Sequence, residues 1–252
     1  MNPTFNGTLV VTGGSRGIGA ATARLAAARG WDVCIGYRAD ASAAAKVVAE
    51  CEAAGAQAVA VQADVSMEID VLDLFDTAER LGPIRGLVNN AGIAAGRSRV
   101  ADLDADRIET LFAVNVLGAF LCAREAVRRM TEGGDGGDGG AIVNVSSRAA
   151  VLGSPGEYVD YAASKAAVDA LTTGLAKEVA ADGIRVNAVR PGLIATDIHA
   201  SAGRPERLAE LAPSVPLGRA GTAEEVAEAI VWLLSEAASY VTGTFLDVAG
   251  GR

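Results

Sequence analysis

The residues TLVVTGGSRGIGAATARLAAARG, Thr8 to Gly30, predict a short apolar strand, a glycine-rich turn and a helix. The turn has the pattern G-x-x-x-G-x-G at Gly13, Gly17 and Gly19, which departs from the G-x-G-x-x-G fingerprint but lies in the same strand-turn-helix context. Glycines let backbone N–H groups approach a pyrophosphate, and the helix N-terminus favours its charge. The stretch therefore predicts a dinucleotide site. The expected contacts are Gly13, Ser15, Arg16, Gly17, Ile18 and Gly19.

Short apolar runs alternate with helix-length stretches along the rest of the chain. We expect strands near residues 8–12, 32–37, 57–62, 84–89, 141–146, 184–189 and 244–248. Strands separated by helices imply right-handed crossovers and a parallel sheet that is covered on both faces. The sequence therefore predicts an α/β chain with a single-domain Rossmann-type doubly wound fold, a seven-stranded parallel sheet with helices on both faces, over residues 1–252.

Length, charge and hydropathy exclude several classes of protein. No uninterrupted apolar run approaches the roughly 18 residues needed to span a bilayer, and residues 1–14 lack the pattern of a signal peptide. A formal net charge of -9 opposes binding to nucleic acid or anionic membranes. The three cysteines, Cys34, Cys51 and Cys122, are scattered in apolar segments and resemble buried small hydrophobes. We expect a soluble, cytoplasmic protein with no nucleic-acid or membrane partner.

A single histidine, His199, limits the chemistry. It makes a multi-histidine metal site impossible, and we expect no metal. The letters Gly13 to Gly17 also satisfy G-x-S-x-G, the nucleophile elbow of α/β-hydrolases, with Ser15 as nucleophile. Only His199 is available as its base, and one strand precedes the elbow, so no earlier loop completes an oxyanion hole. We therefore set the hydrolase interpretation aside.

The end of the second predicted strand bears on the choice of dinucleotide. NAD-binding Rossmann proteins place an acid there for the ribose hydroxyls, whereas this chain has Tyr37 followed by Arg38, with Arg16 in the glycine turn. Two guanidiniums suit a 2′-phosphate, so we favour NADP(H) over NAD(H). The alternative is that Arg38 is a solvated charge and that Asp40 caps a helix or takes the ribose.

Further residues at strand ends complete the expected dinucleotide site. Asn90 follows a buried strand and provides an amide brace for a tight backbone path, or is ordinary turn chemistry. Thr196 follows a rigid Pro-Gly turn and is a candidate contact for a nicotinamide amide, while Asp64 lies where an adenine edge is expected or is only a cap. The remaining expected contacts are Asp64, Val65, Asn90, Ala91, Gly92, Pro191, Gly192, Ile194 and Thr196.

The segment SRAAVLGSPGEYVDYAASK, Ser147 to Lys165, carries the candidate chemistry. Tyr161 and Lys165 are four apart, so a helix places an ammonium beside a phenol. At about 4 Å that charge lowers the phenol's pKa by roughly three units at most, which makes Tyr161 a candidate acid near neutral pH. Ser147 follows a strand and is placed to hold a substrate oxygen; Tyr-x-x-x-Lys is otherwise a surface tyrosine on a lysine stem. Tyr158 is a pocket wall or plain packing.

Three other segments carry expectations. A helix from about Asp104 to Met130 contains Asn115, a polar amide in an apolar pattern that needs a partner or reaches into the site. The tract GGDGGDGG, residues 133–140, is an acidic connector; it lacks the hydrophobic position of calcium-binding repeats, and we assign it no function. Residues 193–219, rich in proline, are expected to form a small substrate lid.

Taken together, TGGSRGIG, NNAG, Asn115, Ser147, YAASK and RPG, in this order, resemble the short-chain dehydrogenase/reductase family over essentially the whole chain. The group with 3-oxoacyl-carrier-protein reductases and glucose-dehydrogenase-like bacterial oxidoreductases is the most similar. The resemblance implies hydride transfer between NAD(P)(H) and a small carbonyl or alcohol, with Tyr161 as general acid/base and Lys165 holding the nicotinamide ribose. It implies that Ser147, with Ser146 as its rival, orients the substrate and that Asn115 steadies a water.

The resemblance also bears on assembly and on competing functions. Similar proteins are usually homotetramers, with a homodimer as the alternative. A protein on the same fold that binds NADP(H) as a sensor or interaction module without chemistry remains open, although the intact Ser147, Tyr161 and Lys165 speak against it. Extended epimerases and dehydratases share Tyr-x-x-x-Lys, but this chain lacks room for their larger C-terminal domain.

Overall fold

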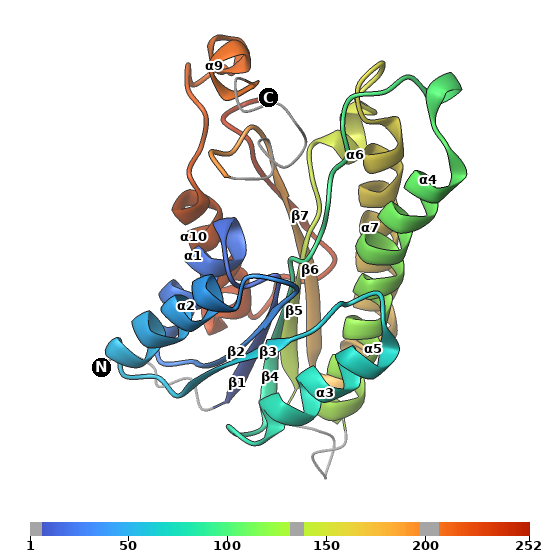
Figure 1. Ribbon diagram of the computed structural model, residues 1–252. Helices are drawn as coiled ribbons and strands as arrows, with labels where there is room; N and C mark the ends of the chain where they lie inside the picture. Colours follow the sequence, from blue (N-terminus) through green and yellow to red (C-terminus); the bar gives the residue numbers. More distant parts are fainter. Residues whose placement is uncertain (1–6, 132–138, 197–206) are drawn as a thin grey trace.

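The computed structural model describes residues 7–131, 139–196 and 207–252, and its centre is a seven-stranded sheet in which every pairing is parallel (Figure 1). The strand order is β3-β2-β1-β4-β5-β6-β7. The strands are β1 (Thr8–Thr12), β2 (Asp32–Tyr37), β3 (Ala58–Gln62), β4 (Ile84–Asn89), β5 (Gly140–Val145), β6 (Ile184–Pro191) and β7 (Phe245–Val248). All seven predicted strands and the single-domain α/β fold are confirmed.

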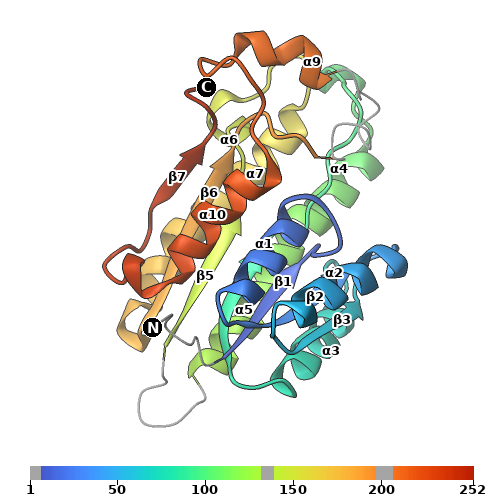
Figure 2. The ribbon, with the colours of Figure 1, turned by 90° about the vertical axis from the view of Figure 1, so that its left-hand side faces the viewer.

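Helices cover both faces of the sheet because the strands are apolar on both sides. In β1, Leu9 and Val11 face one cluster of buried residues, and Val10 faces the other. Helices α1, α2 and α10 pack on the first face and lie side by side in Figure 2, while α3, α5 and α7 pack on the second. Their bounds are α1 (Gly17–Ala28), α2 (Ala41–Ala53), α3 (Glu68–Glu79), α5 (Gly118–Thr131), α7 (Val159–Glu178) and α10 (Ala223–Leu234).

Shorter helical segments connect these elements. They are the 3-10 turns Val100–Asp102, Ala180–Asp182, Ala212–Ser214 and Glu236–Ala238, and the helices α4 (Ala105–Phe112), α6 (Ala149–Leu152) and α9 (Arg207–Leu211). The predicted lid, residues 193–219, is described only in part: Ile194 forms a bridge with Gly221, and α9 follows. His199 and most of the tract at 133–140 lie outside the described residues.

The strand order places a ligand site at the carboxyl end of β1. The chain runs from β1 to β2 and β3 on one side, and then crosses back to β4 on the other side. Loops that leave β1 and β4 therefore diverge to opposite faces, and a crevice opens between them. Open α/β sheets bind ligands at such a switch point. The glycine turn and Asn90 both lie at this edge.

The helix predicted from about Asp104 to Met130 is confirmed as one helical stretch, Ala105–Thr131, but it contains a π-helical segment that was not predicted. A five-residue π-helical segment, Ala113–Leu117, separates α4 from α5. Asn115 lies within it and is 1% exposed. Its side chain bonds to the backbone of Ile93, so the wider turn accommodates an amide that a regular helix would leave without these partners.

The same stretch, Ala105–Thr131, is long and apolar enough to cross a membrane by length and composition alone, with a mean hydropathy of 1.5. Its packing accounts for this composition, since Leu111, Cys122, Ala126 and Met130 are buried in the domain. Core helices of soluble proteins meet the same criterion, so the stretch is weak support for a membrane span.

The three cysteines are free and buried, as predicted from their apolar surroundings. Burial raises the pKa of Cys34 to about 12, of Cys51 to about 11 and of Cys122 to about 12. Thiols with such pKa values stay protonated at neutral pH and are poor nucleophiles, so they serve as packing groups.

Candidate active site

The glycine turn after β1 brings the backbone close to its neighbours. Gly13 has φ +64° and Gly17 has φ +55°, which L side chains rarely adopt. A Cβ on Gly19 would lie 2.5 Å from the Asn90 amide nitrogen and closer still to the carbonyl oxygen of Gly13. Gly19 therefore permits the close packing of α1 on the turn. It does not line the cavity described below, and its direct contact with the dinucleotide stays a prediction.

Helix α1 begins at Gly17, and its first turn is free to bind an anion. The preceding residue, Arg16, makes no side-chain cap, and the first turn contains no acidic residue. The first N–H groups of a helix have no intrahelical partner, and the helix dipole favours negative charge there. A diphosphate fits this turn.

Asn90 fixes the path of the chain beside the turn. Its side-chain nitrogen donates to the carbonyl oxygens of Thr12, at 2.8 Å, and Gly13, at 3.1 Å. The Thr12 hydroxyl accepts the N–H groups of Asn90 and Ala91 at 3.0 and 2.9 Å. The expected amide brace is therefore present, and it joins the ends of β1 and β4 into one rigid wall.

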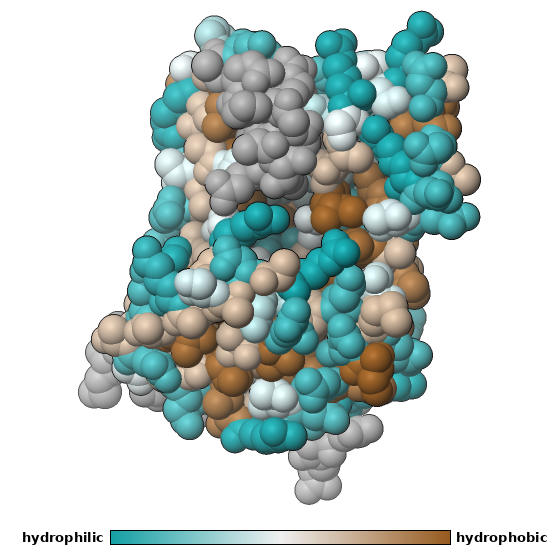
Figure 3. Space-filling view, in the orientation of Figure 1, coloured by the Kyte–Doolittle hydropathy of each residue, from teal (hydrophilic) through white to brown (hydrophobic). Residues whose placement is uncertain are grey.

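A cavity of about 570 Å³ extends from this wall over the ends of β2 and β3. Figure 3 shows the surface hollowed near the centre of this face. Most of the predicted dinucleotide contacts line the cavity: Gly13, Ser15, Arg16, Gly17, Ile18, Tyr37, Arg38, Asp64, Val65, Asn90, Ala91, Gly92 and Thr196. Asp40, the alternative ribose contact, also lines it, as do five residues that were not predicted as dinucleotide contacts: Ala39, Ala63, Ile93, Ala94 and Val114.

The end of the cavity beyond β2 carries charges of both signs. Arg38 Nε lies 3.2 Å from Asp64 Oδ2, and the Arg38 side chain is 66% exposed. Burial acts to raise the pKa of Asp64, but bonds from Ser66 and the charge of Arg38 outweigh it, so the pKa lies below its usual value. Asp40 caps α2 by accepting the N–H of Ala43 at 2.9 Å. The Arg38 guanidinium therefore remains open to solvent and to a ligand.

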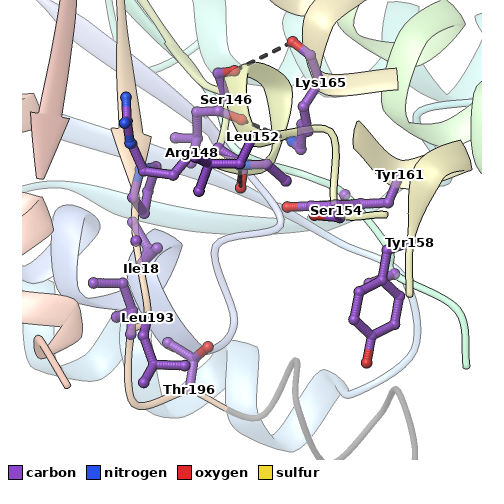
Figure 4. A pocket seen from close by; sticks show the side chains of 18 of the residues that line it. Ile18, Ser146, Arg148, Leu152, Ser154, Tyr158, Tyr161, Lys165, Leu193 and Thr196 are labelled. Atoms are coloured by element: carbon purple, nitrogen blue, oxygen red, sulfur yellow. Dashed lines mark hydrogen bonds between the residues drawn. The ribbon is translucent and has the colours of Figure 1, made fainter. Parts of the chain in front are cut away.

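A second cavity, of about 190 Å³, adjoins the first and shares Ile18, Asn90, Gly92, Ala94 and Thr196 with it. Figure 4 shows how the labelled side chains surround it. The predicted residues Ser147, Tyr161, Lys165, Pro191, Gly192 and Ile194 line this cavity. The candidate catalytic groups and the glycine turn thus face one continuous space.

Lys165 is nearly buried, at 4% exposed, and its ammonium faces the second cavity. Nζ donates to the carbonyl oxygen of Val145 at 2.8 Å, which is the bond drawn beside it in Figure 4. Burial lowers its pKa to about 8, against the opposing effect of the Asp169 carboxylate. An ammonium has three donors, and this contact uses one, so Lys165 retains hydrogen-bonding capacity for a bound polar group.

Tyr161 lies beside Lys165 as the spacing predicted, with Nζ 5.9 Å from the centre of the tyrosine ring. The predicted direction of its pKa is wrong for this structure. Burial raises the pKa of Tyr161, and a hydrogen bond from Ser147 offsets only part of that effect. The ammonium is drawn to the Val145 carbonyl, so the phenol is the neutral, protonated group here.

The two neighbouring serines have different surroundings. Ser146 is 2% exposed, and its hydroxyl donates to the backbone carbonyl of Lys165 at 3.2 Å. Ser147 hydrogen-bonds to Tyr161 and accepts the N–H of Ala149 at 3.1 Å. Ser146 thus ties β5 to α7, and Ser147 is the hydroxyl that accompanies the phenol.

Asn115 lies behind the site and does not line either cavity. Its oxygen accepts the N–H of Ile93 at 2.8 Å, and its nitrogen donates to the Ile93 carbonyl at 2.9 Å and to Ser164 at 3.0 Å. A Cβ on Gly92 would lie 3.3 Å from both Asn115 Oδ1 and Lys165 Nζ. The amide therefore holds the 91–93 segment in place between the two cavities.

An ion pair fixes the start of α7. Asp160 Oδ1 accepts the N–H of Tyr161 at 2.9 Å, and Oδ2 accepts Arg107 Nε of α4 at 2.8 Å. The Asp160 side chain is 3% exposed and the Arg107 side chain 18%. This contact connects the helix that carries Tyr161 to the helix that leads into Asn115.

Several residues of the second cavity escaped the sequence reasoning. Leu152 and Ser154 belong to the segment already quoted, so their nearness to Ser147 was an available signal. Arg252 had no such signal, because it reaches the site from the other end of the chain. Those not assigned were Val145, Ala149, Leu152, Ser154 and Arg252, whereas Leu193 is the first residue of the predicted lid.

Comparison with known proteins gives full-length similarity. Residues 13–252 match the family model described as enoyl-(acyl carrier protein) reductase. An uncharacterized oxidoreductase of Escherichia coli, YgfF, is 55% identical over 96% of this chain and 98% of its own. The 3beta-hydroxysteroid dehydrogenase 1 of Eggerthella lenta is 43% identical over 97% and 92%.

Solved structures are similar to this chain over nearly its whole length. A short-chain type dehydrogenase/reductase from Mycobacterium marinum has a TM-score of 0.91 and 33% identity, over 98% of this chain and 97% of that one. The 3-ketoacyl-(acyl-carrier-protein) reductase from Brucella melitensis, solved with NADH, has a TM-score of 0.90 and 34% identity, over 98% of each chain. The sequence, the fold and the arrangement of the site thus agree that this chain belongs to the short-chain dehydrogenase/reductase family of oxidoreductases.

Proposed function

We propose that this chain transfers a hydride between NADP(H) and a small carbonyl compound or secondary alcohol, in the cytoplasm. The observation that carries the proposal is that Ser147, Tyr161 and Lys165 face a cavity that opens directly into the one formed by the glycine turn. A reacting carbonyl and a dinucleotide thus have adjoining places. The relatives named as reductases and dehydrogenases support the same chemistry.

The residues of the first cavity fit a nicotinamide dinucleotide. The uncapped start of α1 suits the diphosphate, and the buried Lys165 has donors left for ribose hydroxyls. When bound, the nicotinamide supplies or takes up the hydride. Thr196 lines both cavities and is a candidate for the carboxamide.

Within the second cavity, Tyr161 acts as general acid/base. Tyr161 is protonated in this structure, so it holds the proton that a carbonyl oxygen takes up on reduction. Ser147 holds that oxygen beside the phenol, and the Lys165 ammonium favours the phenolate left after proton transfer. Asn115 acts by fixing the segment at Ile93, and its proposed role in holding a water rests on the family resemblance.

The preference for NADP(H) rests on Arg16, in the glycine turn after β1, and Arg38, at the end of β2, which both line the first cavity. Bidentate guanidiniums suit a 2′-phosphate. Arg38 is ion-paired with Asp64, so a bound 2′-phosphate competes with the Asp64 carboxylate for the Arg38 guanidinium. The 3-ketoacyl reductase from Brucella melitensis was solved with NADH, so the preference is a property to measure in this chain.

We also propose a homotetramer, or failing that a homodimer. Leu117 and Phe120 at the start of α5 are 48% and 49% exposed, and Trp232 on α10 is 40% exposed. Figure 3 shows hydrophobic areas on the side of the molecule that carries α4 and α5. Burial of such areas favours association.

Tyr161→Phe tests the chemistry. It keeps the ring and removes the proton, so we expect NADPH to raise the melting temperature of both proteins while turnover on a panel of aldehydes and ketones falls at least a hundredfold in the variant. If Tyr161→Phe retained turnover, the role of Tyr161 as the general acid would be refuted. Stabilisation of the wild type by NADPH with no turnover of any carbonyl would favour a dinucleotide sensor.

A further inference from the structure

Ser154 adopts a backbone conformation that favours glycine. Its φ is +46°, and it is the one non-glycine residue with positive φ in the described ranges 7–131, 139–196 and 207–252. Its loop uses glycine for the same purpose at Gly153, φ +73°, and Gly156, φ +71°. The left-handed region costs free energy for a residue with a Cβ. A serine at this position therefore calls for a reason other than the turn itself.

The fold does not use the Ser154 side chain. Its backbone carbonyl accepts the N–H groups of Glu157 and Tyr158, both at 3.1 Å, and thereby closes the turn that leads into α7. A glycine would make the same two bonds. Its hydroxyl makes no hydrogen bond within the part of the chain that the structure describes. The hydroxyl is thus available to a ligand.

Ser154 lines the second cavity together with Ser147 and Tyr161. Figure 4 shows Ser154 beside Tyr161. The cavity is about 190 Å³, so one small molecule reaches both Tyr161 and Ser154. The rest of the wall is mixed. Its apolar side chains include Ile18, Ala94, Val145, Ala149, Leu152, Leu193 and Ile194, and its polar ones include Tyr158, Lys165, Thr196 and Arg252. The Ser154 hydroxyl provides a polar contact separate from the pair that holds the reacting oxygen.

One basic side chain of the cavity wall, Arg148, is already paired. Arg148 also lines the cavity, but Nη1 lies 2.5 Å from Asp247 Oδ2, and Nε donates to the carbonyl oxygen of Arg252 at 2.8 Å. Figure 4 shows the Arg148 side chain directed away from Tyr161. Its charge is thus balanced by β7. The Ser154 hydroxyl is uncharged and can both donate and accept a hydrogen bond, so it suits a neutral oxygen.

We infer that Ser154 binds a second, uncharged oxygen of the substrate. The substrate class is then a small carbonyl compound with a neighbouring hydroxyl or carbonyl on an apolar body, or the corresponding diol. This inference rests on the proposed function, since it extends the same cavity. Selection for that contact accounts for a serine where glycine is the less strained residue.

The test compares ketones that differ by one hydroxyl: butanone with 3-hydroxybutanone, and cyclohexanone with 2-hydroxycyclohexanone. The selectivity is the ratio of kcat/KM for the hydroxyketone to that for the plain ketone, measured by oxidation of NADPH or NADH. Wild type, Ser154→Ala and Ser154→Gly are compared, because alanine removes the hydroxyl and glycine also relieves the backbone. Ser235→Ala, in a turn after α10, is the matched control.

We expect wild type to prefer each hydroxyketone. Both Ser154 variants should lose three- to tenfold of that selectivity, which is the effect of one neutral hydrogen bond. Their kcat/KM for the plain ketone should stay within about twofold of wild type. Ser154→Gly should also have a higher melting temperature than Ser154→Ala. Equal kcat/KM for both members of each pair in wild type, or selectivity unchanged in the variants, overturns the inference. So does an equal loss on both ketones, which indicates a structural role. Wild type that reduces none of the four contradicts the proposed function as well.

Discussion

Lys165→Met in the protein without dinucleotide should stabilise the fold while it removes activity. The Lys165 ammonium is 4% exposed and has one hydrogen bond, to the Val145 carbonyl. Methionine is close in length and brings no charge into the apolar surroundings. Asp169 keeps its pairing with Arg190, at 2.9 Å, so no carboxylate is left alone by the change.

The magnitude follows from the shift in the pKa of Lys165, from 10.5 to about 8. At about 1.4 kcal/mol for each pKa unit, the folded protein disfavours the ammonium by about 3 kcal/mol relative to the unfolded chain. Loss of the bond to the Val145 carbonyl costs roughly 1 kcal/mol. The net gain is about 2 kcal/mol at pH 7, which raises the melting temperature by roughly 4 to 8 °C for a chain of this length.

The sign of the pH dependence is opposite to that of a paired lysine. Between pH 8 and 10.5 the unfolded chain still binds the proton of Lys165 that the folded chain has lost, so the contribution of this group to stability rises with pH. Below pH 8 both states are protonated, and the penalty is present in full. The advantage of Lys165→Met is therefore greatest below pH 8 and declines toward pH 10.

Thermal unfolding of wild type and Lys165→Met from pH 7 to 10, without dinucleotide, measures this difference. Lys177→Met on the same helix is the matched control, because Lys177 is exposed. A Lys165→Met protein that is less stable than wild type at pH 7, or an advantage that stays constant to pH 10, would show that the ammonium is not penalised by burial.

Other changes test the rest of the site. Arg38→Asp should move the ratio of kcat/KM for NADPH over NADH at least tenfold toward NADH, and an unchanged ratio removes the argument for a 2′-phosphate site. Gly19→Ala places a methyl group against Gly13 and Asn90, so we expect at least tenfold weaker binding of NADPH in titrations with a normal circular dichroism spectrum; unaltered binding would mean that the turn is not held by this contact. Asn115→Ala removes three hydrogen bonds at Ile93 and Ser164 and should lower the free energy of unfolding in urea by about 2 kcal/mol, together with kcat; a loss of less than 0.5 kcal/mol would contradict the bracing role.

The fold was predictable because its signals are local. Short apolar runs alternate with helical stretches, and the central strands are buried on both faces, so the positions of all seven strands could be predicted from the sequence. The π turn at Asn115 was not predictable, since it depends on partners at Ile93 and Ser164, far away in the sequence. The sequence indicated only that the Asn115 amide needed a hydrogen-bond partner.

The site likewise has features that could be predicted from the sequence and features that could not. The spacing of Tyr161 and Lys165 placed both side chains in one cavity, but it gave the wrong direction for the pKa of Tyr161. That direction depends on burial by the whole fold and on the Val145 carbonyl that attracts the ammonium, neither of which a helical spacing contains. Arg252 was missed for a related reason, because only the order of the sheet brings it to β5.

The central claim is that Tyr161 delivers a proton while a hydride reaches the same carbonyl. Reduction of a ketone by NADPH deuterated at the transferring position of the nicotinamide, with the product alcohol analysed by mass spectrometry, tests it most directly. The account predicts one deuterium at the carbinol carbon with wild type, and no product with Tyr161→Phe under conditions where that variant is saturated with NADPH. An alcohol without deuterium, or equal labelled product from Tyr161→Phe, would contradict it.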